Sequence, residues 1–122
     1  MKLIDSNIII YSALQQHAYL RNIFKEEDTF VSEISLLEVL GFGSITDKQE
    51  KYFNAVFQML NKIPVSSEII LNGILLRKKY KLSVGDSIIA SSALTLDLEL
   101  LTNNVSDFKK IDLIKISNPL KL

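Results

Sequence analysis

Five side chains with oxygen donors follow apolar strand-like segments or stand near the starts of helix-like segments in this chain of 122 residues. They are Asp5, Glu38, Asp86, Asn104 and Asp107. In an open α/β sheet, ligands bind at the carboxyl ends of the strands, where the N-termini of the helices also converge. We therefore expect these side chains, which are far apart in the sequence, to meet in one site.

Carboxylates gathered in this way favour a cation, because like charges at close range raise one another's pKa values and destabilise the fold. The chain has no cysteine and one histidine, His17, which excludes thiolate sites and multi-histidine zinc sites. Oxygen ligands alone favour Mg²⁺ or Mn²⁺. Such an ion orients and helps to ionise water, and it offsets the charge that grows on a phosphate under attack. The pattern predicts metal-dependent phosphodiester chemistry, with His17 as a surface or helix residue.

Each of these residues also has a simpler explanation when it is taken alone. Asp5 can cap a helix, Glu38 can close a capping box, and Asp86 can complement a helix dipole. Asn104 and Asp107 can be turn formers. The simple explanation is preferred for any one of them, and only their joint occurrence at several strand ends favours a shared site.

Short apolar strands and helices must alternate to position these residues. Strands are predicted at residues 2–4, 29–32, 63–65, 98–102 and 113–117. Helices are predicted at residues 8–25 (irregular after residue 14), from a capping box at 35–38 to a break at 41–44, and at 47–62, 67–80 and 87–96, with a helical turn in 103–110. This alternation predicts a mainly parallel central sheet in a three-layer α/β/α sandwich, with residues 1–122 as one domain.

Length and composition fit one domain that works in the cytoplasm. A chain of 122 residues, 48% of them hydrophobic, can bury a core without disulfides. No segment reaches the roughly 18 apolar residues that span a bilayer, and charges come too early at the N-terminus for a signal peptide. The balance of 14 basic and 14 acidic residues argues against a protein that coats nucleic acid by bulk charge.

Four blocks of the sequence carry a known pattern. Residues Ile4–Ile8 are an apolar strand end followed by Asp-Ser-Asn, and Val31–Leu40 is a serine-bearing strand followed by a helix with a Glu. Leu82–Ala90 places Asp before an apolar-apolar-Ala helix, and Leu101–Phe108 reads Thr-x-Asn-x-x-Asp-Phe once its first residue is set aside. These blocks, in this order and with this spacing, resemble the PIN-domain family, and in particular VapC-type toxin ribonucleases of type II toxin–antitoxin systems. Ile116–Pro119 resembles the family's usual ending.

The resemblance implies a PIN-like fold and an Mg²⁺- or Mn²⁺-dependent endoribonuclease that leaves 5′-phosphate and 3′-hydroxyl ends. Asp5, Glu38 and Asp86 match the family's metal-binding carboxylates. Asn104 matches a fourth position that is Asp in many relatives, so either a second ion binds weakly there or Asp107 supplies the missing charge. Whether one or two ions bind stays open.

Other polar residues have expected supporting roles. By resemblance, Ser6, Asn7 and Thr102 orient the carboxylates or the water through hydrogen bonds. The basic segments Arg77–Lys81 and Lys109–Lys110 are candidates for contacts with phosphates that flank the cut site. Basic side chains at the end of a helix that complement its dipole are an equally good explanation.

The resemblance also implies three partners: an RNA substrate, for which small relatives favour tRNA loops, a small antitoxin protein, and a second copy of the chain in a two-fold homodimer. The predicted helix 47–62 carries Tyr52, Phe53, Phe57 and Met59. These side chains either form an apolar groove wall for an antitoxin helix or pack into the core.

Two other functions stay open at this point. An aspartate-based phosphotransferase of the HAD or receiver type also places Asp after the first strand. The HAD pattern needs a second Asp two residues later, where this chain has Asn7, and the paired acids and lysine of a receiver are not found. The other alternative is a catalytically weak PIN-fold module that only binds partners, against which the three intact carboxylates argue.

Overall fold

The computed structural model describes residues 1–120 and contains one parallel β-sheet. Its strands lie in the order β3-β2-β1-β4-β5, and every neighbouring pair is parallel. The chain runs outward from β1 to β3 and then crosses back to β4 and β5. The strand bounds are β1 Lys2–Ile4, β2 Thr29–Ser32, β3 Asn61–Ile63, β4 Glu99–Leu101 and β5 Ile116–Ser117.

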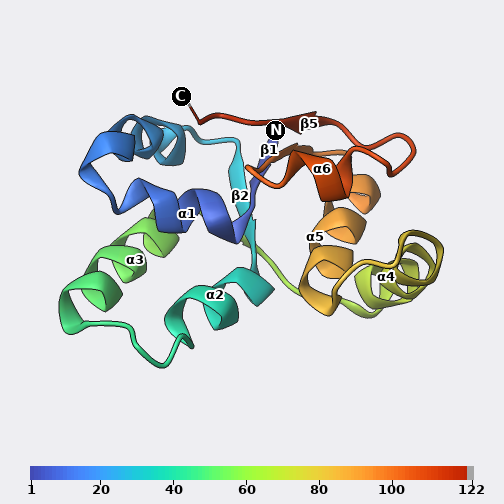
Figure 1. The fold of residues 1–122 in the computed structure, drawn as a ribbon, viewed down its shortest axis with the longest axis horizontal. Helices are drawn as coiled ribbons and strands as arrows, with labels where there is room; N and C mark the ends of the chain where they lie inside the picture. The colour runs from blue at the N-terminus through green and yellow to red at the C-terminus, as the bar shows by residue number, and fades with distance from the viewer. Residues whose placement is uncertain (121–122) are drawn as a thin grey trace.

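Helices cover both faces of this sheet (Figure 1). On one face lie α1 (Ser6–Ser12), the irregular 3₁₀ segment η1 (Gln15–Lys25), α2 (Glu33–Leu40) and α3 (Asp47–Met59). On the other face lie α4 (Ser67–Tyr80), α5 (Val84–Thr95) and α6 (Val105–Phe108). The predicted three-layer α/β/α sandwich with a parallel sheet is therefore confirmed.

The two layers of helices enclose two apolar clusters, one on each side of the sheet. Leu3 and Ile4 are adjacent in β1, so their side chains point to opposite faces. Leu3 packs with the cluster that α5 borders, and Ile4 packs with the cluster of α1 and α3. Both side chains are fully buried, and each burial stabilises the fold by about 1.5–3 kcal/mol.

The start of α2 differs from the prediction. Ser32 caps the helix, because its backbone is still extended and its Oγ accepts a hydrogen bond from Ile34 N at 3.2 Å. Ser35 lies inside the helix and is fully buried. The predicted capping box of Ser35 and Glu38 is therefore wrong, and Glu38 lies past the first turn.

Several other boundaries are shifted by two or three residues. Helix α1 begins at Ser6 rather than residue 8, and β3 spans Asn61–Ile63 rather than 63–65. Helix α3 ends at Met59 rather than residue 62, since Asn61–Ile63 pairs with β2 as an edge strand. Helix α5 begins at Val84 rather than residue 87, because Ser83 accepts a hydrogen bond from Asp86 N and caps it. The last strand is restricted to Ile116–Ser117. The earlier start of α5 places Asp86 in the first turn of the helix rather than directly before it.

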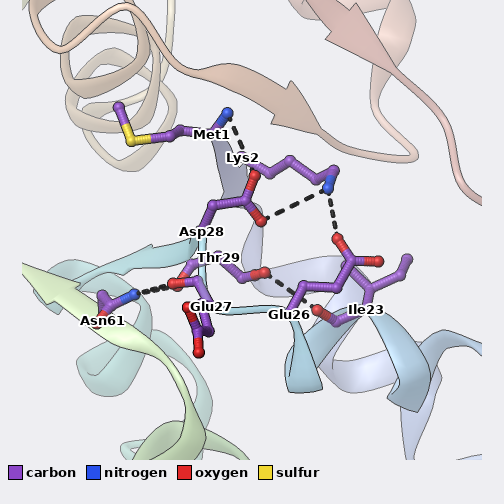
Figure 2. Close-up of polar contacts among 8 residues, drawn as sticks. All are labelled: Met1, Lys2, Ile23, Glu26, Glu27, Asp28, Thr29 and Asn61. Atoms are coloured by element: carbon purple, nitrogen blue, oxygen red, sulfur yellow. Dashed lines mark hydrogen bonds and ion pairs between the residues drawn. The ribbon is translucent and has the colours of Figure 1, made fainter.

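Charged side chains hold the amino end of β1 (Figure 2). Lys2 Nζ contacts Glu26 Oε2 at 2.5 Å and Asp28 Oδ1 at 3.8 Å, and the amino group of Met1 lies 3.5 Å from Asp28 Oδ2. The acids at this end of the sheet therefore have cationic partners. Within residues 1–120, no helix is long and apolar enough to cross a membrane.

Candidate active site

The candidate site lies where the strand order reverses, between β1 and β4. Asp5 directly follows β1, Thr102 directly follows β4, and Asp5 N donates to Leu101 O at 3.0 Å across the two strand ends. Parallel α/β sheets bind ligands at this kind of position, because the helices on either side diverge from it.

Asp5 is buried at this point, with 6% of its surface exposed. Its Oδ1 accepts a hydrogen bond from Ser6 N at 2.8 Å, which also caps α1. Its Oδ2 accepts hydrogen bonds from Thr102 Oγ1 at 2.7 Å and from Asn7 Nδ2 at 3.2 Å. All three donors are neutral, so the carboxylate is oriented but its charge is not balanced.

This burial makes the charge of Asp5 costly. Burial raises the pKa of Asp5 to about 6 from an ordinary value of 3.8, against the lowering effect of the hydrogen bonds from Thr102 and Ser6. The nearby charges of Asp86 and Glu38 contribute a smaller part of this rise. A cation bound at this carboxylate would remove much of that cost.

Glu38 reaches the same region from α2. Its Oε1 accepts a hydrogen bond from Ser6 Oγ at 2.9 Å. Its Oε2 lies against the first turn of α5, where a Cβ added to Gly85 would be 2.8 Å away. Glu38 is thus placed between α1 and α5, beside the residue that precedes Asp86.

Asp86 and Asp107 complete the acidic group. Asp86 is partly buried in the first turn of α5, and this burial raises its pKa. The charges of Asp107 and Glu38 raise the pKa of Asp86 further, while Lys110 lowers it. The carboxylates of Asp5, Glu38 and Asp86 are therefore close enough to repel one another, and Asp107 is close enough to repel Asp86.

Asn104 joins this group indirectly. Its backbone N–H donates to Thr102 Oγ1 at 2.9 Å, and its side-chain Nδ2 donates to Asp107 Oδ2 at 3.0 Å. Asn104 therefore orients Asp107, while the charge at this corner comes from Asp107. This arrangement favours the alternative in which Asp107 supplies the charge that Asn104 lacks.

The predicted supporting residues all contact the acids or one another. Thr102 is fully buried and donates to Asp5, and Ser6 donates to Glu38. Asn7 contacts Asp5 through Nδ2, and its Oδ1 accepts from Asn103 N at 3.2 Å. His17, by contrast, lies in η1 with its ring edge-on to Tyr11 and hydrogen-bonded to Tyr19.

Two residues that contact Glu38 or its hydrogen-bond donor Ser6 were not predicted from the sequence. Ser35 Oγ is hydrogen-bonded to Ser6 Oγ at 2.8 Å, and Gly85 leaves room for the Glu38 carboxylate. Ser35 was assigned to a cap, because a serine three residues before a Glu fits that pattern. Gly85 carries no side chain, so only its place next to Asp86 could have drawn notice.

The chemistry of these donors fits a hard divalent ion. All the donors are oxygens, and none of the ion pairs within residues 1–120 involves Asp5, Glu38, Asp86 or Asp107. In the same part of the chain, no three or more His, Cys, Asp or Glu side chains are arranged to hold a metal ion by themselves. The site would thus bind an ion through one or two carboxylates with water completing the shell, as Mg²⁺ commonly is bound.

Of the predicted basic and aromatic side chains, only Lys110 acts on the acidic group. Arg77–Lys79 form the exposed last turn of α4, which fits the dipole explanation, whereas the charge of Lys110 acts on Asp86. In α3, Phe53 and Phe57 are buried in the core. Core packing is therefore the main role of the α3 aromatic side chains.

A PIN-domain family model matches residues 2–113. The chain belongs to the PIN-domain family. The predicted resemblance is confirmed by this match, which covers all five acidic and amide positions. A comparison with curated proteins gives no match.

Solved structures of toxin–antitoxin proteins share the fold over the whole chain. A toxin–antitoxin complex from Klebsiella pneumoniae contains a chain that is 28% identical, with 100% of both chains covered and a TM-score of 0.81. VapBC2 from Rickettsia felis, bound to a promoter DNA fragment, matches at 21% identity, 96% and 97% coverage and a TM-score of 0.80. FitAcB from Neisseria gonorrhoeae matches at 19% identity, 100% coverage of both chains and a TM-score of 0.81.

Proposed function

We propose that this PIN-domain protein is the ribonuclease toxin of a toxin–antitoxin pair and hydrolyses RNA with Mg²⁺ or Mn²⁺. The observation that carries the proposal is the buried carboxylate of Asp5 at the switch point, which has no ion-pair partner within residues 1–120 and has the charges of Asp86 and Glu38 close enough to repel it. The family match and the toxin–antitoxin complexes among the similar structures support the same reading.

The residues divide the work according to their contacts. Asp5, Glu38 and Asp86 would hold the ion, one or two of them directly and the rest through water, and the bound ion would activate water and offset charge on the phosphate. Thr102 and Asn7 fix the orientation of Asp5 through their hydrogen bonds. The expected products carry 5′-phosphate and 3′-hydroxyl ends.

Two neighbouring residues adjust the charge of the site. Asp107, held by Asn104, adds a carboxylate at the Asp86 side. Lys110 brings a positive charge to the same side, where it would contact a phosphate next to the cut. The substrate is RNA, with the loops of structured RNA such as tRNA as the preferred class.

A groove of about 350 Å³ beside Glu38 supports an antitoxin partner. It is lined mainly by apolar side chains of α1, α2, α3 and the segments that follow α1 and α2: Ile10, Tyr11, Ala13, Leu14, Val39, Phe42, Ile45 and Phe53. An amphipathic helix would lay its apolar face in such a groove and bring a basic side chain to Glu38. Helix α3 contributes Gln49 and Phe53, as many lining residues as α1 or α2.

The remaining partners follow the family pattern. Helix α4 exposes apolar side chains, among them Leu71 and Leu75 at 64% and 66% exposure. Such a surface on a small domain is compatible with a two-fold homodimer. We place the activity in the cytoplasm, where RNA and a newly made antitoxin are both available.

A cleavage assay on the purified chain tests the proposal. A structured RNA labelled at one end should be cut in Mg²⁺ or Mn²⁺, and EDTA should stop the reaction. Asp86→Asn should abolish cutting, whereas Asp97→Asn, an exposed acid before β4 that pairs with Lys115, should not. Cleavage that survives both EDTA and Asp86→Asn would overturn the proposal.

Growth assays test the toxin role separately. Expression of the chain alone should arrest growth, and a small protein encoded next to it should relieve the arrest. Unimpaired growth on expression of a chain that cleaves RNA in vitro would favour a nuclease that is not a toxin.

A further inference from the structure

The carboxylate of Glu38 is held from two sides, by a pair of hydroxyl groups and by a glycine. Its Oε1 accepts from Ser6 Oγ at 2.9 Å, and Ser6 Oγ is hydrogen-bonded to Ser35 Oγ at 2.8 Å. Its Oε2 lies against Gly85. Glu38 is otherwise an exposed, long side chain, and such a side chain keeps its rotamer freedom unless contacts restrict it.

The Ser6 hydroxyl lies between two acceptors. A serine hydroxyl has one proton to donate, and a carboxylate can only accept. Ser6 Oγ is the donor toward both Glu38 Oε1 and Ser35 Oγ. Ser35 Oγ therefore restricts the position of the Ser6 hydroxyl that contacts Glu38.

Ser35 differs from four other buried serines in helices. Ser12, Ser87 and Ser92 each donate to a carbonyl of their own helix, a common local arrangement for this residue type, and Ser91 donates to Ile69 O in α4. Ser35 is fully buried, and its hydroxyl is bonded to Ser6 instead. Because Ser35 is not exposed to solvent, the partner of Ser6 Oγ at this point is the Ser35 hydroxyl and not a solvent water.

Gly85 is not required by the backbone of α5. None of the glycines in residues 1–120 has a positive φ, and alanine is the better helix former. A Cβ at Gly85 would lie 2.8 Å from Glu38 Oε2 and 3.5 Å from its Cδ. The missing side chain therefore leaves room for one thing, the carboxylate of Glu38 next to Asp86.

We propose that Ser35 and Gly85 are positioning residues that fix Glu38 beside Asp86, one through the Ser6 hydroxyl and the other by leaving the surface of α5 open. Neither residue reaches the substrate or the ion. This proposal rests on the proposed function, because it takes Glu38 to serve the bound ion.

The variant Gly85→Ala should displace Glu38 without lowering the stability of the protein. The variant should melt at or above the temperature of the unmodified chain, because the added methyl group favours the helix and the flexible Glu38 side chain can move away. RNA cleavage and Mn²⁺ affinity should each fall about 10- to 100-fold, the usual effect of losing an outer-shell contact. Gly73→Ala in α4 is the matched control, since its nearest neighbouring atom would lie at an ordinary 3.5 Å, and it should keep both properties.

Ser35 is tested by removal, rescue and a double variant. Ser35→Ala should lower cleavage and Mn²⁺ affinity, and Ser35→Thr, which keeps the hydroxyl, should restore both. Ser35→Ala should cause no further loss in a Glu38→Ala background. Ser92→Ala, which removes another buried helix hydroxyl, should leave cleavage unchanged.

Crystal structures of the metal-free variants give a readout that does not depend on nuclease activity. Glu38 should occupy one rotamer and accept from Ser6 in the unmodified chain and in Ser35→Thr, and it should leave that position in Ser35→Ala and Gly85→Ala. An unchanged Glu38 in both of the last two structures overturns the proposal. If the unmodified chain neither cuts RNA nor binds Mn²⁺, the proposed function fails, and these structures still decide whether Ser35 and Gly85 fix Glu38.

Discussion

Replacing the central acid should make the metal-free protein more stable. The pKa of Asp5 is raised to about 6 from 3.8, so keeping Asp5 ionised in the folded chain costs about 3 kcal/mol. The stabilising contribution of a protonated Asp5 is complete below pH 3.8 and is lost as the pH rises through about 6. Asp5→Asn has no charge to bury, so its advantage should be small at pH 4 and largest above pH 7.

The gain should be smaller than the full cost of the charge. In the variant, the amide oxygen still accepts the hydrogen bond from Ser6 N. The amide NH₂ group, however, faces Thr102 and Asn7, which both donate to Asp5 in the unmodified chain. Mismatched hydrogen bonds of this kind cost about 1–2 kcal/mol. The net expected gain above pH 7 is therefore about 1–2 kcal/mol, or roughly 3–10 °C in melting temperature for a chain of this size.

Thermal unfolding in EDTA between pH 4 and pH 8 measures this difference. Adding Mn²⁺ should raise the melting temperature of the unmodified chain and have little effect on Asp5→Asn, because ligands stabilise only the state that binds them. Asp97→Asn serves as the control and should show no gain at any pH. An Asp5→Asn protein that is less stable than the unmodified chain in EDTA at pH 7.5 would refute this reasoning.

Three other substitutions probe the support of the site, the core and the groove. Thr102→Val removes the buried donor to Asp5 and should lower the free energy of unfolding by about 1–3 kcal/mol, measured by urea denaturation; an unchanged stability would show that this hydroxyl is dispensable. Leu3→Ala should cost about 2–5 kcal/mol in the same measurement, and a smaller loss would mean that the sheet tolerates a cavity there. Phe42→Asp, which changes a side chain that is 63% exposed in the groove, should weaken binding of the antitoxin by calorimetry and leave RNA cleavage intact; loss of cleavage with intact binding would contradict the assignment of the groove.

Much of the fold could be predicted because short strands and caps leave clear patterns. Residues 2–4 and 29–32 are predicted with the bounds that the structure has. Each is a short apolar run whose last residue, Ser32, or next residue, Asp5, caps the following helix. The order of the strands was not predicted, because it depends on which helices pack together across the sheet.

The errors arise where two residues can play the same local role. Ser32 and Ser35 are both able to cap α2, and only the extended backbone at Ser32 decides between them. The same holds for Ser66 and Ser67 at the start of α4, where Ser66 is the cap. A cap is chosen by where the preceding strand or turn ends, and that is set by pairing elsewhere in the sheet.

The acidic residues of the candidate site could be predicted from the sequence, but the residues that position Glu38 could not. Asp5, Glu38 and Asp86 stand at positions where any parallel sheet would bring them together, and the structure places their charges within reach of one another. Ser35 and Gly85 act through contacts with Glu38 and its partner Ser6 that only the packing of α1, α2 and α5 creates. The metal role of the acids stays a prediction.

Anomalous diffraction from crystals soaked in Mn²⁺ tests that role most directly. We expect a manganese peak bound to Asp5 and Asp86, with Glu38 reaching it directly or through water, and no such peak in Asp5→Asn crystals. At saturating Mn²⁺, no peak at these carboxylates, or a peak only at the acids near Lys2, would contradict that role.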